Sequence, residues 1–336
     1  MFAMLLGAWP RVLVDGTRVA DLEADAAAGR APTATVDDAV ERLVGEAVDA
    51  QVEAGMGFVT DGSVRWADPA AELVRALEAG DAGPDGLLVR AWRATAARTD
   101  RPVAQVVPGP WTLARLGLAG PGDPAALPAR ARALADTLAG ELEALGEAGC
   151  PAVQVLEHDA VTIGADPARR GGFLEAHRRL LERAGGVHAM LAVVGGSAAD
   201  AGAETILGAP YESLLVDLVA GPDNWRLVRA APGERGIVCA ALEAGDGRER
   251  RDQAPELVWA ARYAASANGR GLDRVGLANG SPLGSLTPAE ARTALDGLGR
   301  AAALAGMPVD AAMAAGLDPR VQPHPLRRPG RPRSDA

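Results

Sequence analysis

The sequence predicts a single (β/α)8 barrel, in which eight parallel strands alternate with helices. Short runs rich in Val, Leu and Ile alternate with longer Ala/Leu/Glu/Arg segments of helical periodicity. The chain has 336 residues, more than the roughly 250 that such a barrel needs. The first apolar run leads into "GAWPR", which lacks the glycine-rich phosphate loop expected after strand one of a doubly wound open sheet.

Eight segments have the pattern of buried strands, because each is a short apolar run bounded by turn-forming or charged residues. They are residues 2–9, 57–62, 102–109, 152–159, 186–194, 213–219, 235–242 and 274–280. Each is followed by a segment long enough for a crossover helix, the connection that parallel strands require.

Four of the intervening segments show the helical pattern most clearly. Residues 36–53 and 127–145 repeat apolar side chains at i, i+3, i+4 and i+7. The first carries acidic residues in its expected first turn, and the second ends at a glycine. Residues 255–267 and 288–304 open with a proline, and Thr287 precedes the last segment as a helix cap.

Composition excludes several classes of function. The formal charge of −10 disfavours binding to phosphate backbones, and 3% aromatic residues leave few stacking platforms for nucleic acid. The chain contains no lysine, which excludes Schiff-base chemistry and a P-loop. Its two cysteines, Cys150 and Cys239, form neither a disulfide framework nor a four-cysteine zinc site.

The ends of the chain set further expectations. The apolar start "MFAMLLGAW" lacks a basic flank and is too short to span a bilayer, so we expect a soluble cytoplasmic protein without membrane contact. Residues 1–315 are predicted to form the barrel. Residues 316–336, rich in proline and arginine, are predicted to be a basic, disordered tail.

Polar residues at the carboxyl ends of the predicted strands are the candidates for a site, because barrel chemistry lies there. They are Trp9, Arg11, Asp61, Ser63, Trp111, Glu157, His158, Asp159, Asp217, Cys239, Asn279 and Ser281.

Several of these strand ends resemble the cobalamin-independent methionine synthase family, within the wider superfamily that includes uroporphyrinogen decarboxylase. The similar stretches are "LLGAWPR", "AQVEAGMGFVTDGSVRW", "VVPGPWTLA", "LGEAGCPAVQVLEHDAV", "YESLLVDLV", "PGERGIVCAAL" and "GLANGSPLGSL". They occur in the family's order and span roughly residues 5–305. The resemblance implies a barrel that moves a methyl group from a folate to a thiol.

In that family a zinc ion, held by one histidine, two cysteines and one glutamate, binds the thiol and favours the reactive thiolate. The resemblance puts Met190, Ala192, Asp217 and Ser281 at those four positions. Only Asp217 could still ligate zinc, so we expect the family site not to be intact and no cofactor to be present.

The substrate side departs from the family as well. Ser63 replaces a glutamate that helps to hold the amino acid, and Leu156 replaces an aspartate contact. Recognition of homocysteine is therefore in doubt together with zinc.

His188 lies two residues before Met190, on the same strand face but deeper in the barrel. It is either a buried, hydrogen-bonded histidine or part of a rearranged metal site with His158, Glu157 and Asp217. Met190 is expected to be core.

Glu157 and His158 are adjacent, so strand alternation sends them to opposite faces. One could be a general acid or base, or both could form strand-end hydrogen bonds. Cys239 is expected to behave as a small apolar residue, because nothing near it in sequence would lower its pKa.

Arginine and tryptophan side chains complete the predicted site. Arg11 and Arg65 are candidate contacts for an anion such as a folate tail, or surface ion pairs. Trp9, Trp66 and Trp111 could line a pocket for a pterin-like ring, or plug the barrel end.

The leading hypothesis is a divergent methionine synthase-like protein that transfers a methyl (C1) group from a folate-type donor to a small acceptor. Glu157, His158 and Asp217 are its candidate catalytic residues, and a folate or an amino-acid thiol is its expected ligand. The alternatives are a non-catalytic binding or regulatory barrel and a metal-free enzyme resembling uroporphyrinogen decarboxylase.

Overall fold

The computed structural model describes residues 1–117, 124–244, 252–308 and 310. These residues contain seven parallel strands in one sheet. The strands are β1 (Phe2–Met4), β2 (Ala104–Pro108), β3 (Ala152–Glu157), β4 (His188–Val193), β5 (Ser213–Asp217), β6 (Gly236–Leu242) and β7 (Val275–Asn279). Each lies within one of the predicted segments.

Helices connect the strands. The α-helices are α1 (Val19–Ala27), α2 (Thr33–Glu53), α3 (Pro69–Glu78), α4 (Leu87–Ala96), α5 (Pro110–Leu116), α6 (Leu127–Glu147), α7 (Pro167–Leu181), α8 (Ala203–Gly208), α9 (Trp225–Ala230), α10 (Ala254–Ser266) and α11 (Pro288–Gly306). Short 3-10 turns are η1 (Pro124–Ala126), η2 (Asp159–Thr162), η3 (Ala199–Ala201), η4 (Pro222–Asn224), η5 (Ala267–Gly269) and η6 (Leu272–Arg274).

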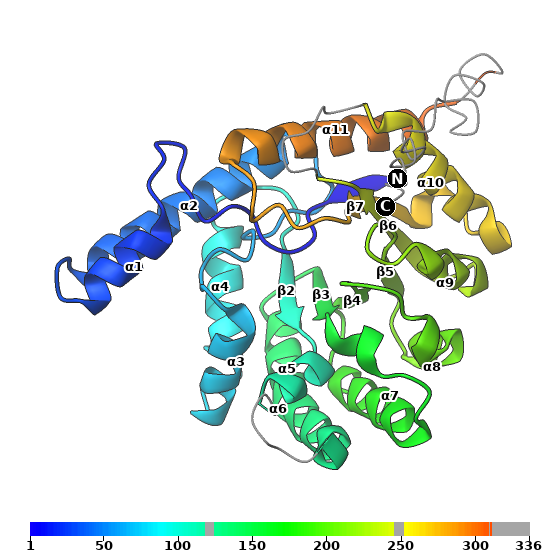
Figure 1. The fold of residues 1–336 in the computed structure, drawn as a ribbon, viewed down its shortest axis with the longest axis horizontal. Helices are drawn as coiled ribbons and strands as arrows, with labels where there is room; N and C mark the ends of the chain where they lie inside the picture. Colours follow the sequence, from blue (N-terminus) through cyan, green and yellow to red (C-terminus); the bar gives the residue numbers. More distant parts are fainter. Residues whose placement is uncertain (118–123, 245–251, 309, 311–336) are drawn as a thin grey trace, which may run out of the picture.

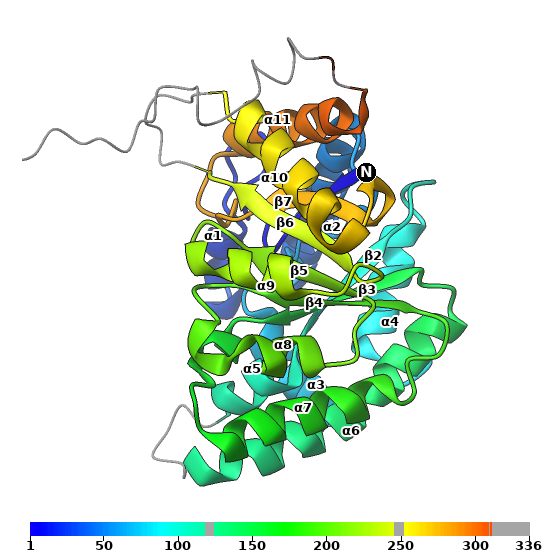
Figure 2. The same ribbon diagram turned by 90° about the vertical axis from the view of Figure 1, so that its right-hand side faces the viewer.

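The strand order is β1-β7-β6-β5-β4-β3-β2, and every neighbouring pair is parallel. The helices lie on the outside of the sheet, and Figure 1 looks onto the carboxyl ends of the strands. Figure 2 shows the same strands from the side, with their carboxyl ends on the left. The fold is therefore an α/β fold with a curled, barrel-type parallel sheet.

Alternation along the strands creates two separate apolar layers. On β4, Leu191 belongs to the layer between the sheet and the helices, whereas Met190 and Ala192 belong to an inner layer. That inner layer also contains Met4 from β1 and Leu215 from β5. Strands that are distant in the sheet meet on this face because the sheet curls around it.

The predicted strand at residues 57–62 is not a regular strand, which corrects the expectation of eight. Its backbone still reaches both edges of the sheet: Gly57 N donates to Ala3 O at 2.9 Å, and Val59 forms an isolated parallel bridge to Val103. At Thr60, the side chain of Gln51 makes the hydrogen bonds that a neighbouring strand would make in a regular sheet. Its Oε1 accepts from Thr60 N at 2.9 Å, and its Nε2 donates to Thr60 O at 2.8 Å. Both backbone groups of Thr60 therefore have hydrogen-bond partners without a continued strand pairing beyond Val59.

The four helical segments predicted most clearly are all helices, and their observed ends differ from the predicted ends by a few residues. Thr287 caps α11 in a capping box with Glu290, as expected from the sequence. Helix α2 begins at Thr33, three residues earlier than predicted, so its first turn contains no acidic residue.

No helix within the described part of the chain is long and apolar enough to cross a bilayer. The predicted tail at 316–336 lies outside the described residues.

Candidate functional site

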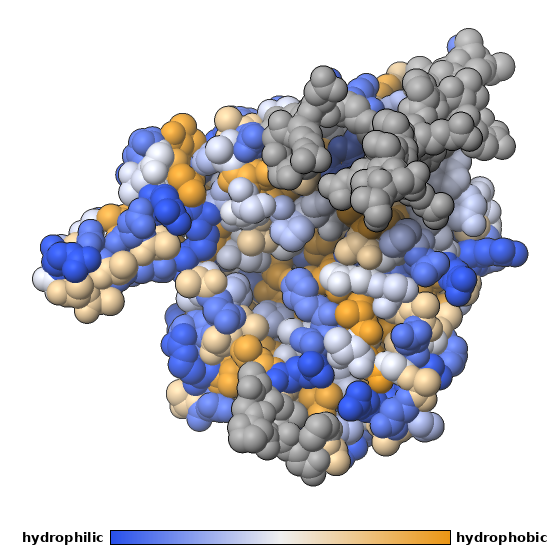
Figure 3. Space-filling view, viewed as in Figure 1, coloured by the Kyte–Doolittle hydropathy of each residue, from blue (hydrophilic) through white to orange (hydrophobic). Residues whose placement is uncertain are grey.

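A cavity of about 450 Å³ opens at the carboxyl ends of the strands. We call it the C-terminal cavity. Its floor is apolar, formed by Leu6, Val106, Pro108, Leu156 and Val194. The space-filling view looks onto this end of the molecule and shows apolar surface at its centre (Figure 3). Such a cavity matches the usual form of a small-molecule site, with apolar walls and a few polar groups.

Half of the sequence-predicted site residues line this cavity. They are Asp61, Ser63, Trp66, His158, Asp217, Asn279 and Ser281. The others point elsewhere, and the contacts they make explain why. They are Trp9, Arg11, Arg65, Trp111, Glu157, His188 and Cys239.

Asp61 places a carboxylate in the cavity wall. It follows the bridge at Val59 and is buried. Its Oδ1 accepts from Ser63 N at 2.8 Å, in a turn where Ser63 adopts a φ of 52°. Burial raises the pKa of Asp61, because removal from water disfavours the charged form. Asp61 therefore presents a buried carboxyl group at the cavity wall, with Arg65 Nε 3.4 Å from its Oδ2.

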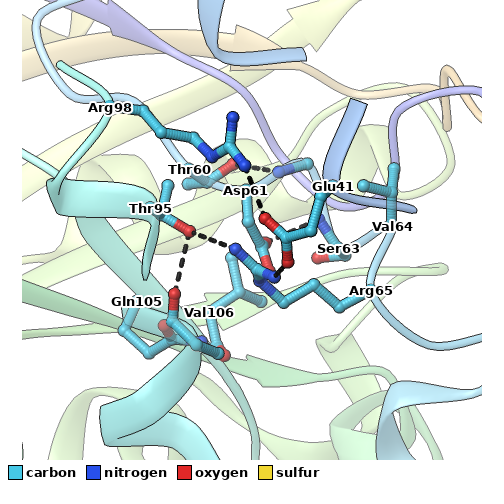
Figure 4. A network of polar contacts seen from close by, with 12 residues as sticks. Glu41, Thr60, Asp61, Ser63, Val64, Arg65, Thr95, Arg98, Gln105 and Val106 are labelled. Carbon is cyan, nitrogen blue, oxygen red and sulfur yellow. Dashed lines mark hydrogen bonds and ion pairs between the residues drawn. The ribbon is translucent and has the colours of Figure 1, made fainter. Parts of the chain in front are cut away.

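Neither of the two arginines expected to bind an anion lines the cavity, and each is paired with a carboxylate. Arg65 contacts Glu41 at 2.5 Å and Asp61 at 3.4 Å, and it donates to Thr95 Oγ1 at 3.2 Å (Figure 4). Arg11 makes two hydrogen bonds to the Glu23 carboxylate. No arginine lines the C-terminal cavity among the residues that the structure describes.

Asp217 lines the cavity, but backbone groups already occupy its carboxylate. Oδ2 accepts from Gly195 N at 3.0 Å. Oδ1 accepts from Val219 N at 3.0 Å and from Ala220 N at 2.9 Å. Both oxygens thus hold the loops after β4 and β5 in place, which leaves little capacity for a ligand or a metal.

Asn279 has a similar positioning role at the end of β7. Its Oδ1 accepts from Leu6 N at 2.9 Å, and its Nδ2 donates to Leu6 O at 2.8 Å and to Ser281 O at 3.0 Å. It therefore joins β7 to the residues after β1 and fixes the backbone of Ser281 at the rim.

Glu157 and His158 face opposite sides, as alternation predicts. His158 is exposed and lines the cavity, with Nδ1 on the side of Gly195. Glu157 is fully buried and points outward, where it accepts from Trp111 N at 2.9 Å and from Thr112 N at 2.8 Å. Glu157 is thus a helix-capping side chain rather than a group that reaches the cavity.

Sequence reasoning missed the two partners behind Glu157. His177 Nε2 lies 3.2 Å from Glu157 Oε1, and its Nδ1 lies 2.6 Å from the hydroxyl of Tyr211. His177 lies on α7, outside the strand-end motifs, and Tyr211 opens the stretch "YESLLVDLV" just before β5. The pKa of Tyr211 is raised well above its usual value by burial and by the charge of Glu157. The only signal was an isolated histidine on a helix face, which does not reveal its partners.

The tryptophans divide between the wall and the core. Trp66 lines the C-terminal cavity. Trp9 and Trp111 are fully buried, and their indole Nε1 atoms have no hydrogen-bond partner among the described residues. Trp111 packs edge-on against Phe173 under α5. These two rings support the barrel end from behind and do not contact a ligand in the cavity.

Three residues on the strands lie outside the C-terminal cavity because of their position or orientation. His188 begins β4 at the opposite end of the sheet, where it is exposed and its Nε2 lies 2.8 Å from Ser213 Oγ. It is therefore hydrogen-bonded, as expected, but not buried. Cys239 faces α10 and is fully buried, and burial raises its pKa to about 12. Met190 packs in the inner apolar layer, as predicted.

The positions that the sequence resemblance equates with zinc ligands do not form a metal site within the part of the chain that the structure describes. Ala192 has no donor atom, Met190 offers only a thioether in the inner layer, and both oxygens of Asp217 accept backbone hydrogen bonds. Within residues 1–117, 124–244 and 252–308, no group of three or more His, Cys, Asp or Glu side chains is arranged to hold a metal. A rearranged site built on His188 is excluded by its place at the opposite end of β4.

Several cavity residues were not predicted from the sequence. Asp68 caps α3 by accepting from Ala71 N at 2.9 Å, and Leu88 comes from α4. Thr112 and Gln105 complete the wall on the side of β2 and α5. Asp68-Pro69 is a helix-start signal in the sequence, and it would have placed Asp68 near the rim.

Comparison with solved structures shows which proteins share this architecture. A B12-independent methionine synthase from Shewanella sp. W3-18-1, in complex with selenomethionine, superposes with a TM-score of 0.68 and 13% identity, over 90% of this chain and 96% of that one. A protein from Listeria monocytogenes assigned as a vitamin-B12-independent methionine synthase gives 0.66 and 16% identity, over 92% and 98%. No family model and no curated protein sequence matches the chain.

The structure thus defines the class of protein as an α/β fold with a curled, barrel-type parallel sheet and a ligand-sized cavity at the strand carboxyl ends. Its structural neighbours are cobalamin-independent methionine synthase-like proteins. At these identities the likeness shows the fold, and function has to be argued from the cavity.

Proposed function

We propose that the chain is a divergent methionine synthase-like protein that binds a folate-type methyl donor in the C-terminal cavity and passes the methyl group to a small acceptor without zinc. In this proposal residues 57–59 take the place of the eighth barrel strand. The observation that carries the proposal is the buried carboxyl of Asp61 in the wall of an apolar cavity of about 450 Å³. The shared fold of the methionine synthase-like neighbours supports it.

The chemistry of a pterin ring suits this wall. Its aminopyrimidinone edge presents adjacent N–H donors, and a carboxylate offers about four acceptor positions. Among the described residues, Asp61 Oδ1 accepts from Ser63 N and Oδ2 lies 3.4 Å from Arg65 Nε, so each oxygen keeps a lone pair for a ligand. Trp66 offers a flat apolar surface beside it. The glutamate tail of the folate would extend toward solvent, because no arginine among the residues that the structure describes lines the cavity to bind it.

Methyl transfer forms a bond from the acceptor to the methyl carbon while the bond from folate N5 to that carbon breaks. Folate N5 must be protonated to leave as a neutral amine, and the acceptor gives up its own proton. Of the three predicted catalytic residues, His158 lies at the cavity and makes no backbone hydrogen bond with its side chain among the described residues, so we assign it the proton transfer. Glu157 faces α5, and Asp217 holds loop backbones.

Calorimetry with 5-methyltetrahydropteroyl-triglutamate tests binding. We expect Asp61→Asn to weaken binding by about tenfold, the factor for one hydrogen bond to a charged group. Asp159→Asn is the matched control, since burial also raises the pKa of Asp159 although it does not line the cavity. Failure of the folate to bind the wild-type protein would overturn the proposal.

A second candidate, a binding barrel without catalysis, is favoured by the occupied hydrogen bonds of Asp217 and Asn279. A single-turnover assay with the labelled methyl-folate and small thiols separates the two. Methyl transfer that is lost in His158→Ala, with folate binding retained, supports the enzyme. Folate binding with no transfer to any thiol supports the second candidate. The observations favour the decarboxylase-like alternative less, because no arginine among the described residues lines the cavity to hold an acidic substrate.

A further inference from the structure

A second cavity, of about 380 Å³, lies at the opposite end of the sheet, among the amino-terminal ends of the strands. We call it the N-terminal cavity. The two cavities are separated by the middle of the inner apolar layer, where Ala192, Leu215, Ala240 and Ala278 are buried and line neither of them. In barrels of this kind the amino-terminal end is normally packed for stability, so a cavity of this size there needs an explanation.

The wall of the N-terminal cavity contains a buried polar group with no adequate partner. Gln154 on β3 is 0% exposed, and its Oε1 accepts no hydrogen bond from any residue that the structure describes. Its Nε2 has only the sulfur of Met4 at 4.0 Å, a weak acceptor. An amide in such surroundings costs stability unless something else bonds it. Gln154 therefore offers both a donor and an acceptor to a ligand in this cavity.

Most of the remaining wall is apolar and polarisable, and the hydrogen-bonded pair His188 and Ser213 adds one polar patch. Phe2 and Phe58 form an edge-to-face pair with ring centroids 5.6 Å apart. Met4, Met190 and Val238 extend the same surface. Aromatic edges and thioether sulfurs make favourable contacts with an aromatic ring, so a flat ring fits this lining better than a flexible polar chain.

Charged residues surround the mouth. Three carboxylates, those of Glu212, Glu234 and Asp273, line the cavity together with one guanidinium, that of Arg274, and the imidazole of His188. Glu212 also accepts from Ala189 N at 2.9 Å. An excess of acidic groups at the opening favours a cation and repels an anion.

We infer that the N-terminal cavity is a binding site for a small aromatic amine with a hydroxyl group on the ring. The hydroxyl bonds the Gln154 amide, the ring lies among the Phe and Met side chains, and the ammonium remains at the acidic mouth. The site is independent of the folate site at the other end of the sheet. A binding site at this end also gives a reason for the polar residue within the inner layer.

Isothermal titration of the full chain with tyramine tests the inference. Two comparators separate its parts: phenethylamine lacks the hydroxyl, and 4-hydroxyphenylacetate replaces the ammonium by a carboxylate. We expect tyramine to bind about five- to tenfold more tightly than phenethylamine, the factor for one hydrogen bond. We expect 4-hydroxyphenylacetate to bind at least as weakly as phenethylamine, because it meets the acidic mouth.

Variants locate the site. Gln154→Leu should remove the preference for tyramine over phenethylamine while leaving the melting temperature unchanged or raised, since it removes an unpaired buried amide. Glu234→Gln should weaken both amines, and Glu204→Gln is its matched control, an exposed glutamate on α8 paired with Arg170. Asp61→Asn, in the other cavity, should leave tyramine binding unchanged.

Two results would overturn the inference. The first is no tyramine binding at millimolar concentration, which would mean that Gln154 is satisfied by water alone. The second is tyramine binding that survives Gln154→Leu with its preference intact or disappears in Asp61→Asn, which would place the amine elsewhere. Either result leaves the folate proposal standing, and failure of the folate to bind leaves the amine site standing.

Discussion

Glu157 Oε1 lies 3.2 Å from His177 Nε2, and both side chains are completely shielded from solvent. Glu157 ends β3, and His177 lies on α7, so the contact ties a strand to the helix that covers it. Nε2 thus faces a carboxylate, and the other ring nitrogen, Nδ1, lies 2.6 Å from the hydroxyl of Tyr211. A residue whose sequence position indicated catalysis thus organises the structure behind the cavity.

Glu157→Gln should lower the free energy of unfolding by about 2 kcal/mol. The carboxylate accepts from Trp111 N, from Thr112 N and from Thr112 Oγ1, so an amide would turn a donor toward other donors. Urea unfolding measures the change. Glu212→Gln, an exposed glutamate with one backbone hydrogen bond, is the control and should change stability by less than about 0.5 kcal/mol. Equal effects of the two substitutions would contradict a special role for Glu157.

The stability of the protein should depend on pH through Asp61. Its pKa is raised by burial above the usual value of 3.8, so the folded state binds the proton more tightly than the unfolded state. Its contribution to stability is therefore fully present below pH 3.8 and is lost as the pH rises through the folded-state pKa.

Comparison with Asp61→Asn isolates this contribution. The stability of the wild type minus that of the variant should fall as the pH rises from 3.5 to 7, measured by urea unfolding at each pH. A difference that stays constant, or that grows with pH, would show that Asp61 is not the group responsible.

The two cysteines should be unreactive in the folded protein. Burial raises the pKa of Cys150 to about 11 and that of Cys239 to about 12, so almost no thiolate is present at pH 8. Iodoacetamide labelling followed by mass spectrometry should show modification only after denaturant is added. Rapid labelling of Cys239 in the native protein would mean that it is accessible, contrary to its place between β6 and α10.

Purified protein should not contain tightly bound zinc at one equivalent. The positions that resemble the family's ligands are Met190, Ala192, Asp217 and Ser281, and they lack a suitable donor set. Elemental analysis should find substoichiometric zinc, and dialysis against EDTA should leave the melting temperature unchanged. Stoichiometric zinc that resists dialysis, and whose removal lowers the melting temperature, would disprove this interpretation.

Much of the fold could be predicted from local pattern. Seven predicted strand segments contain strands, and the opposite orientations of Glu157 and His158 follow from strand alternation. The cap at Thr287 is likewise a local signal. The exception is residues 57–62, where Gln51, a side chain from the preceding helix, takes the hydrogen bonds of Thr60. The residues of the strand segment alone do not show that the side chain of Gln51 will take these hydrogen bonds.

The candidate site was less predictable, because a polar residue at the end of a strand can either line the cavity or form hydrogen bonds and ion pairs with other parts of the protein. Arg65 follows the cavity-lining residue Ser63 closely in the sequence. Its guanidinium nevertheless pairs with Glu41 on α2 and does not line the cavity. The N-terminal cavity was missed altogether: Gln154 lies inside an apolar strand run, and its lack of a partner is visible only in three dimensions.

The sequence by itself determined the alternation of strands and helices and the apolar faces that pack them. These follow from periods of about 2 and 3.6 residues and from residue identity, both of which are local. Only the tertiary structure decided which polar groups remain available to a ligand. Within the described residues, Asp61 accepts one backbone hydrogen bond and lies 3.4 Å from Arg65, Asp217 accepts three backbone hydrogen bonds, and Gln154 Oε1 accepts none. The physical reason is that each hydrogen bond is settled by groups brought together from distant parts of the chain.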